Sequence, residues 1–406
     1  MTRPNLGLSK TLDYVQPDRH CTDIFASTMW TMNMGHQTDA HILVMGQGIA
    51  GLTAAIVLGE AGYSVQVLGR RFPAPGGLQL SPNGFKALAA LGLDKPVLEK
   101  AVRLRSVEIK SLSAHRHLTE IIHQPDQTHA AIARQDVLDL LSARAERIPL
   151  VSFTDTRLEA LHVKAGKAQI VSQDGQVFLG DEVIGADGAN GLARAAIAGQ
   201  NQSQMKAVYR AMRAEVKADH LPAVLRRQST LLLLGDGCHL VSYPIAGGTR
   251  NNLVFCAASE QLGPGWAERI FSSLPVLACL SDPSVKWTDT PLYPAQALPV
   301  WRRERVTLIG DAAHVMPPHL AQGAGQTFVD CACLKAELAR LPLSDALSQM
   351  AATRSKDVQK IIQKATASGQ VMRLGGLASR ARNMFIDLAG PRFMKSWLND
   401  VWDTDS

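Results

Sequence analysis

The sequence predicts an α/β fold: a Rossmann-type nucleotide-binding domain, an inserted and mostly antiparallel β-sheet domain, and a helical C-terminal part. Three observations predict this arrangement. A strand, a glycine turn, a helix and a second strand follow one another over residues 40–68. Several strand-like runs lie between residues 205 and 260, and the composition is mainly helical from residue 324 to about 398. The first of these patterns is a βαβ unit, which belongs to a parallel sheet.

The individual elements follow from periodicity and from the positions of glycine and proline. An apolar run ends at Gly46, a helical stretch over 49–61 ends before Gly62, and β-branched residues alternate over 64–68. The same criteria predict two more helices, at 81–93 and 134–147, and a β-meander over 151–183 that leads into a strand at 182–185. They predict three strands of the inserted sheet, at 230–234, 239–242 and 253–258, and one further buried strand at 305–309.

The composition is that of a globular chain with a scattered basic surface. Of 406 residues, 46% are hydrophobic and 19% are charged, and the formal net charge is +6. Lys and Arg form no run or stripe, which argues against a nucleic-acid partner, and no apolar stretch is long enough to span a membrane. The six cysteines form no C-x-x-C pair, so we expect a cytoplasmic protein without a metal site. Residues 1–38 show no motif and are expected to be a disordered or dispensable extension.

The glycine turn of the βαβ unit carries the first chemical motif, Gly46-x-Gly48-x-x-Gly51. Gly46 allows the tight turn, Gly48 lets the backbone approach a pyrophosphate, and Gly51 permits close packing of the helix on the strand. The second strand then ends in Gly69-Arg70, where an acidic residue would hold a ribose. Glycine followed by arginine also suits the 2′-phosphate of NADP, so this motif alone does not choose between FAD and NADP.

Two further glycine–aspartate motifs favour FAD. Asp187 and Gly188 follow the strand at 182–185, and Gly310 and Asp311 follow the strand at 305–309. An aspartate at the carboxyl end of a parallel strand lies where ligands bind and can accept hydrogen bonds from hydroxyls. The glycine-rich helix start at 322–325 places N–H donors toward the negative charge of a reduced flavin.

With these three motifs in this order, residues 40–400 resemble the single-component FAD-dependent aromatic hydroxylases with the p-hydroxybenzoate hydroxylase fold. The salicylate hydroxylase-like branch is the most similar, and the segments 80–84, 132–136, 243–244 and 354–402 support it. The resemblance implies a discontinuous FAD-binding domain over 39–107, 131–197 and 287–345. It implies a substrate domain over 108–130 and 198–286, and a helical C-terminal region over 346–406.

The resemblance also implies a role for each motif residue. The pyrophosphate would contact the three glycines, with Arg134 beside it, and Asp187 and Gly188 belong to a motif shared between FAD and NAD(P)H. Arg70 is a further candidate for cofactor binding, at the end of the second strand. Asp311 would bind the ribityl chain. The residues that would face the isoalloxazine are Gln322, Gly323 and Ala324, and Pro318 would lie near its reactive edge. The departures from the family pattern are Gly69, Gly191 (a common serine), Gly325 (a common asparagine) and Val329 (a common glutamate).

The implied activity is that of an FAD-dependent monooxygenase that uses NADH or NADPH and O2 to hydroxylate a small aromatic acid or phenol through a flavin C4a-hydroperoxide. Such chemistry needs a group that deprotonates the phenol, and the candidates are His239, Tyr243 and His319. For His239 and Tyr243 a structural role is an equal alternative. Two other functions stay open, namely hydroxylation of a larger lipophilic substrate such as a quinone precursor, and nucleotide binding without turnover. A homodimer is one expected assembly.

Overall fold

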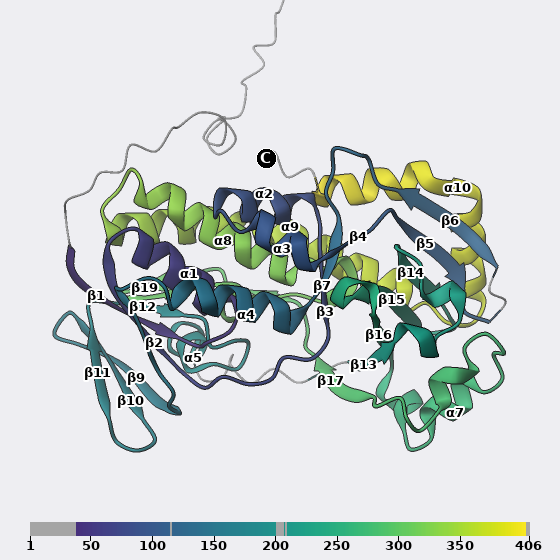
Figure 1. Cartoon of the computed structure of the whole chain (residues 1–406), viewed down its shortest axis with the longest axis horizontal. Coiled ribbons are helices and arrows are strands. Elements are labelled where there is room, and N and C mark those ends of the chain that lie inside the picture. Colours follow the sequence, from purple (N-terminus) through teal and green to yellow (C-terminus); the bar gives the residue numbers. More distant parts are fainter. Residues whose placement is uncertain (1–37, 114–115, 200–206, 208, 403–406) are drawn as a thin grey trace, which may run out of the picture.

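The computed structural model describes residues 38–113, 116–199, 207 and 209–402 (Figure 1). The extension expected at 1–38 therefore lies outside the described residues, except for Thr38, where the first strand begins. In the described parts of the chain no helix is long and apolar enough to cross a membrane.

A six-stranded sheet forms the nucleotide-binding part, in the order β19-β20-β12-β1-β2-β8. All neighbours are parallel except β19 and β20. The strands are β1 (Thr38–Met45), β2 (Tyr63–Leu68), β8 (Val151–Thr154), β12 (Glu182–Gly185), β19 (Arg302–Arg303) and β20 (Val306–Leu308). The predicted βαβ unit is confirmed, with α1 (Ile49–Glu60) between β1 and β2.

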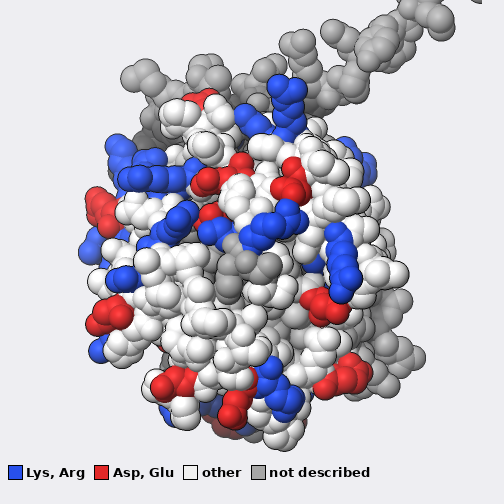
Figure 2. Space-filling view, turned by 90° about the vertical axis from the view of Figure 1, so that its right-hand side faces the viewer, with Lys and Arg blue, Asp and Glu red and all other residues white. Residues whose placement is uncertain are grey.

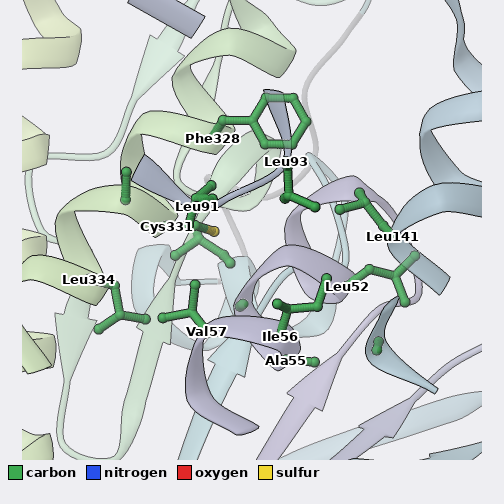
Figure 3. Close-up of a cluster of buried hydrophobic side chains, with 14 of the residues drawn as sticks. Leu52, Ala55, Ile56, Val57, Leu91, Leu93, Leu141, Phe328, Cys331 and Leu334 are labelled. Carbon is green, nitrogen blue, oxygen red and sulfur yellow. The ribbon is translucent and has the colours of Figure 1, made fainter. Parts of the chain in front are cut away.

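Both faces of this sheet are covered, as a parallel sheet requires. Ile42 and Val44 of β1 face one core and Leu43 and Met45 face another, since alternate residues of a strand point to opposite sides. The first core lies under α1, α2 (Pro82–Ala90), α3 (Asp94–Lys100), α4 (Arg134–Ala145) and α8 (Gly323–Leu338). Figure 3 shows side chains from these helices, among them Leu52, Leu141 and Phe328, converging in it. The second core is closed by α5 (Leu192–Ala198) and by the predicted β-meander, which forms β9 (Leu158–Lys164), β10 (Lys167–Ser172) and β11 (Val177–Gly180).

A seven-stranded sheet forms the second part, in the order β17-β13-β16-β15-β14-β5-β6. Only the pair β14 and β5 is parallel, so the prediction of a mostly antiparallel sheet is confirmed. Its strands are β5 (Ser106–Ser111), β6 (His117–Ile122), β13 (Tyr209–Lys217), β14 (Thr230–Leu234), β15 (His239–Ile245), β16 (Arg250–Ala257) and β17 (Thr288–Leu292). A small sheet of β3 (Gly77–Leu80), β7 (Ala130–Ala133) and β4 (Val102–Arg103), together with the pair β18 (Gln296–Ala297) and β21 (His314–Val315), lies near the junction.

The C-terminal part is helical, as predicted. Helix α9 (Leu343–Met372) packs along α8, and α10 (Gly376–Trp402) crosses to the far end of the molecule and packs on β6 (Figure 1). Helix α10 is broken at Gly390, which has φ 59° and precedes Pro391. The short helix α7 (Trp266–Phe271) lies beyond the second sheet. On the end of the molecule drawn in Figure 2, Lys and Arg side chains are interspersed with Asp and Glu.

Candidate active site

One cavity of about 2270 Å³ runs from the carboxyl ends of the parallel strands to the second sheet. This volume is more than twice the ~300–1,000 Å³ of a single small-molecule site, so the cavity has room for more than one ligand. The glycine turn after β1 and both glycine–aspartate motifs line one end, called here the cofactor end. Side chains of β13–β16 and of the loop at 317–321 line the other end, called here the substrate end.

The three glycines of the first motif have different roles. Gly51 packs against the turn, because a Cβ at Gly51 would overlap the carbonyl oxygen of Gly46. Gly46 has φ 109°, and a Cβ there would overlap the carbonyl oxygen of Ala186. Gly48 has no atom within 4 Å of its Cβ position and lines the cavity. This turn leaves the N–H groups at the start of α1 free to bind phosphate oxygens, which fits the pyrophosphate of a dinucleotide.

The second strand ends at Gly69 instead of the usual acidic residue, and the backbone conformation at this position favours glycine. Gly69 has φ 144°, and a Cβ there would lie 3.3 Å from the Cα of Gly46. The side chain of Gln47 bridges the turn, since its Nε2 donates to the carbonyl of Gly69 at 2.5 Å and its Oε1 accepts from Arg71 at 3.0 Å. Arg70 is exposed and lines the cavity next to this position. A nucleotide bound here would therefore meet an amide and guanidinium groups.

Asp187 lines the cavity with half of its carboxylate unpartnered. Its Oδ2 accepts from the N–H of Ala193 at 3.1 Å, whereas its buried Oδ1 has no hydrogen-bond partner. Burial raises its pKa to about 6. A Cβ at Gly191 would overlap this carboxyl group, which explains glycine in place of the common serine. Gly188 follows with φ 84° and also lines the cavity.

The third motif presents Asp311 to the cavity and keeps Gly310 behind it. Gly310 has φ 58° and donates its N–H to Asp330 Oδ2 at 3.1 Å. Asp311 is exposed and lines the cavity, where its negative charge also faces Arg134. The predicted contact between Asp311 and a ligand hydroxyl thus has room to form. Gly310 contributes by adopting the positive φ that the turn requires.

Behind this turn, a buried network links the third motif to the start of α8. Asp330 accepts hydrogen bonds at 2.8 Å from His314 and at 2.9 Å from Arg354 as well as from Gly310. Burial raises the pKa of Asp330, but these three partners outweigh it and lower the pKa. Arg354 continues the chain to Gln326 at 2.5 Å, and Gln326 donates to Gln322 at 3.0 Å. His314 is fully buried in this network, which gives it a structural role.

Gln322 does not present its side chain to the flavin position. It is 1% exposed, accepts from Asn83 at 2.8 Å and donates to Ser81 at 2.7 Å. Any contact of Gln322 with an isoalloxazine would have to come from its backbone, and its position facing the flavin stays a prediction. Gly323 and Ala324 do line the cavity, at the first residues of α8.

Helices α2 and α8 approach closely at Gly84 and Gly325. A Cβ on Gly84 of α2 would lie 3.3 Å from the Cα of Gly325, whereas a Cβ on Gly325 would lie at an ordinary 3.8 Å from the Cα of Gly84. The family segment at 80–84 therefore supports the start of α8 through two hydrogen bonds and one glycine contact. Nothing in the structure explains glycine in place of the common asparagine at 325.

Arg134 stands between the two ends of the cavity. It is the first residue of α4, and its buried Nε has no partner. Burial lowers its pKa, and the neighbouring guanidinium of Arg213 lowers it further, against smaller opposing effects of Tyr243 and Asp311. Two cations that face the same space attract an anion. The predicted position of Arg134 beside a pyrophosphate is compatible with this arrangement.

At the substrate end, His239 and His319 lie with ring centroids 5.4 Å apart. The Nδ1 atom of each ring is buried and unpartnered, and burial lowers the pKa of His239 to about 3 and that of His319 to about 4. The ring of His319 rests on α9 at Gly369, where a Cβ would overlap it. Pro318 precedes His319 in the same loop and lines the cavity. Both imidazoles are thus neutral hydrogen-bonding groups at neutral pH.

Tyr243 lines the cavity, but its hydroxyl is hydrogen-bonded to the backbone. Its Oη donates to the carbonyl of Gly77 at 2.9 Å, and burial raises its pKa to about 12. This geometry favours the structural alternative left open for Tyr243. The same hydrogen bond ties the second sheet to β3 of the junction.

Sequence analysis missed two features of the substrate end. Arg213 of β13 lines the cavity, and its guanidinium forms no hydrogen bond or ion pair within the described residues. His123 and His129 stack with centroids 3.5 Å apart beneath Trp402, and burial lowers their pKa values to about 4 and about 3. The alternation of buried and half-buried residues along 209–217 is the signal that could have marked Arg213. No local pattern connects His123 and His129 with Trp402.

Comparison with known proteins agrees with the geometry. A family described as FAD binding domain matches residues 39–368. The 3-hydroxybenzoate 6-hydroxylase of Polaromonas naphthalenivorans is 30% identical over 369 residues, 85% of this chain and 91% of that protein. The 3-hydroxybenzoate 6-hydroxylase 1 of Aquipseudomonas alcaligenes is 28% identical over 90% of this chain and 98% of its own length. Among solved structures, HpxO of Klebsiella pneumoniae in complex with FAD and uric acid has a TM-score of 0.78 at 20% identity, and it covers 92% of this chain and 98% of that one.

Proposed function

The chain belongs to the FAD binding domain family, and from this premise we propose that its substrate is a small aromatic acid that already carries a ring hydroxyl. The protein is an FAD-dependent aromatic monooxygenase with NADH or NADPH as co-substrate. The relatives named above are 3-hydroxybenzoate hydroxylases, and others are 3-amino-4-hydroxybenzoate monooxygenases. These names support an aromatic acid with a ring hydroxyl as the substrate. They also favour a catalytic protein over one that binds a nucleotide without turnover.

The observation that carries the proposal is Arg213. A guanidinium without a counter-charge that faces a cavity is suited to a carboxylate, which it can bind with two parallel hydrogen bonds. A quinone precursor with a long apolar chain would leave this cation unpaired. Arg213 therefore favours the aromatic acid over the larger lipophilic substrate.

His239 is the residue that we propose for deprotonation of the ring hydroxyl. Its imidazole is neutral and its Nδ1 is buried without a partner, so it can accept a hydrogen bond from a phenol. A phenolate or carboxylate nearby would raise the pKa of His239 from its low value, since an opposite charge favours the protonated ring. His319, 5.4 Å away, is placed to receive the proton or to orient the substrate.

The cofactor end fits FAD on the basis of its own residues. The open space at Gly48, the unpartnered Oδ1 of Asp187 and the exposed carboxylate of Asp311 offer partners for a pyrophosphate and for hydroxyls. FAD bound there would supply reduction by NAD(P)H and the activation of O2. The chain itself would exclude water, since apolar side chains such as Val241, Val254 and Leu234 line the adjoining space.

The experiment is hydroxylation in 18O2. The FAD-loaded protein should oxidise NAD(P)H faster when 3-hydroxybenzoate is present and should release a dihydroxybenzoate that contains one 18O atom. Arg213→Met should raise KM for the acid about tenfold or more, the value of one charge-assisted contact of ~1.5–3 kcal/mol. Phenol, which has no carboxylate, serves as the control and should be unaffected. Equal losses for both compounds would contradict the role of Arg213.

We also place the reaction in the cytoplasm, where NAD(P)H is available, and propose that the chain assembles as a homodimer. The support for the dimer is the exposure of large apolar side chains on α10, among them Leu377 and Leu388.

A further inference from the structure

The cavity continues past His239 to the opposite edge of the second sheet. In the strand order β15-β14-β5-β6, the cavity-lining residue of β6 lies three strand spacings from the strand of His239, about 14 Å. Val107 and Ile121 pair across β5 and β6 and line this part of the cavity, and α10 packs on β6 (Figure 1). We call this part the Trp402 pocket, and six residues form its walls: Val107, Ile121, His123, His129, Leu398 and Trp402.

This distance separates the Trp402 pocket from the site proposed for the substrate. Arg213 lies on β13, on the other side of β15 from β6. A molecule with a single ring that reaches from Arg213 to His239 is too short to extend to β6 as well. A ligand in the Trp402 pocket is therefore a second molecule.

Two imidazoles of the Trp402 pocket each have a buried nitrogen without a partner. The rings of His123 and His129 are stacked with centroids 3.5 Å apart, and the ring of Trp402 meets both edge to face. Stacked rings cannot bond to each other, because the hydrogen bonds of an imidazole lie in its plane. His123 Nδ1 and His129 Nε2 have no hydrogen-bond partner within the described residues, and His129 is 6% exposed. Buried polar atoms are normally satisfied, so these nitrogens point to a bound polar group.

The backbone holds both rings in place. His123 follows β6 and donates its N–H to the carbonyl of Arg105 at 2.9 Å. His129 precedes β7, and its carbonyl accepts from the N–H of Leu104 at 2.9 Å. The two unpartnered nitrogens are therefore presented at fixed positions, as a binding site requires.

The charge of the Trp402 pocket selects against an anion. No Lys, Arg, Asp or Glu of β5, of β6 or of the half of α10 after Gly390 lines the cavity among the described side chains. Burial lowers the pKa of His123 to about 4 and that of His129 to about 3, so both rings are neutral at neutral pH. A carboxylate would lose its hydration here without meeting a cation, whereas it would find one at Arg213. The pocket therefore suits an uncharged ligand.

The walls of the pocket indicate the shape of this ligand. Three aromatic side chains of α10 line this side of the cavity, namely Phe393, Trp397 and Trp402. A flat ring packs against such walls with a large contact area. A hydroxyl group both donates and accepts, which matches the one donor and the one acceptor of a neutral imidazole. An aromatic ring that carries a hydroxyl meets both requirements.

We propose that the Trp402 pocket is a second ligand site, which binds an uncharged phenol with its hydroxyl on His123 and His129 and its ring against Trp402. The bound phenol would contact β6 and α10 together and would stabilise their packing. It would differ from the proposed substrate in lacking the carboxylate that Arg213 attracts. The inference does not depend on the proposed hydroxylation.

The test is calorimetric titration of the FAD-loaded protein with 2-naphthol, a phenol that is uncharged at neutral pH. Binding should raise the temperature of unfolding. His129→Phe and His123→Phe should each weaken the binding about tenfold or more, because the ring is kept and the nitrogen is lost. The matched control is His239→Phe, which makes the same change at the proposed substrate site and should leave this binding unchanged. Retained flavin absorbance shows that each variant is folded.

Two other compounds examine the chemistry of the pocket. Naphthalene, which has no hydroxyl, should bind about tenfold more weakly than 2-naphthol, and the anion 2-naphthoate should not displace 2-naphthol.

Four results would overturn the proposal. They are no binding of 2-naphthol, binding that is lost in His239→Phe but kept in His129→Phe, equal affinities for naphthalene and 2-naphthol, and tighter binding of 1-decanol, which would show that the pocket holds an alkyl chain. The titrations use no NAD(P)H, so a failure of the proposed hydroxylation would leave them unchanged.

Discussion

The two ends of the cavity are built in different ways. At the cofactor end, the shape comes from backbone turns in which glycines approach other atoms more closely than a Cβ would permit. The polar groups of the network around Asp330 are hydrogen-bonded to one another. At the substrate end, the shape comes from side chains of a sheet, and a guanidinium and several ring nitrogens lack partners. Buried polar groups without partners are costly. The comparison teaches that backbone turns fix the shape of the cofactor end, whereas the substrate end is shaped by side chains from separate strands and is completed by its ligand.

The largest effect should come from breaking the turn at the cofactor end. In Gly51→Ala the new methyl group would overlap the Gly46 carbonyl, so α1 must move away from β1. The cost should exceed the ~1–3 kcal/mol of ordinary overpacking. We expect little folded protein and no bound flavin, as measured by thermal unfolding and by absorbance of the purified protein.

Gly48→Ala is the matched control, because nothing lies within 4 Å of its Cβ position. It should unfold at the wild-type temperature and lose only FAD affinity, since its methyl group would enter the space for the pyrophosphate. Similar unfolding temperatures for Gly51→Ala and the wild type would show that the turn is not the rigid element described here.

The next largest effect concerns the network behind the third motif. Asp330→Ala removes the acceptor for His314, Arg354 and Gly310, and it leaves the buried guanidinium of Arg354 with only the more distant carboxylate of Asp357, at 3.6 Å. Breaking a buried pair in this way costs about 3–5 kcal/mol. Urea unfolding should show this loss. His314→Ala should lose less, because Asp330 keeps its other two partners; an equal loss would contradict the network.

The substrate end should make the protein sensitive to acid. The folded pKa values of His129 and His239 are both about 3, below the ordinary value of 6.5, so below pH 6.5 the unfolded chain binds more protons. Stability is therefore fully present above about pH 6.5 and falls as the pH drops toward 3, by about 1.4 kcal/mol per pH unit for each histidine. His129→Phe should flatten this loss between about pH 6.5 and 5, measured by urea unfolding. An unchanged slope would mean that His129 is not buried as a neutral ring.

The smallest effect is expected at Gly69. An added carboxylate in Gly69→Glu would contribute ~1.5–3 kcal/mol through a ribose hydroxyl. The φ of 144° would cost a non-glycine residue about 1–3 kcal/mol, which offsets this gain. Calorimetric titration should therefore show a change in FAD affinity of less than about tenfold. Unchanged FAD binding together with lost NADP binding would place a 2′-phosphate here instead.

The sequence predicted the cofactor end better than the substrate end, for physical reasons. Tight turns need glycine at fixed spacings, so the turns at Gly46 and Gly310 leave local signals. The orientation of Gln322 depends on Ser81 and Asn83, about 240 positions away, and no local pattern contains it. The departure at Gly191 weakened the resemblance by sequence, but it is explained by the close approach of the Asp187 carboxyl group in the fold.

The substrate end is harder to predict because its residues come from separate strands. Arg213, His239 and His319 belong to β13, β15 and a loop near α8, and only the sheet order brings them to one cavity. His239 and Tyr243 lie four residues apart on β15, and both line the cavity. Their chemistry differs all the same, because one side chain is unpartnered and the other is bonded to Gly77.

The ratio of flavin to protein absorbance after gel filtration tests most directly whether the two ends are independent. Asp311→Ala removes a carboxylate that faces the cofactor, whereas Arg213→Met removes a cation that faces the substrate, and neither side chain has a hydrogen-bond partner in the described structure. We predict that Asp311→Ala loses most of its flavin and that Arg213→Met keeps the wild-type ratio but loses NAD(P)H oxidation stimulated by 3-hydroxybenzoate. Full flavin content in Asp311→Ala, or an equal loss in both variants, would contradict the account.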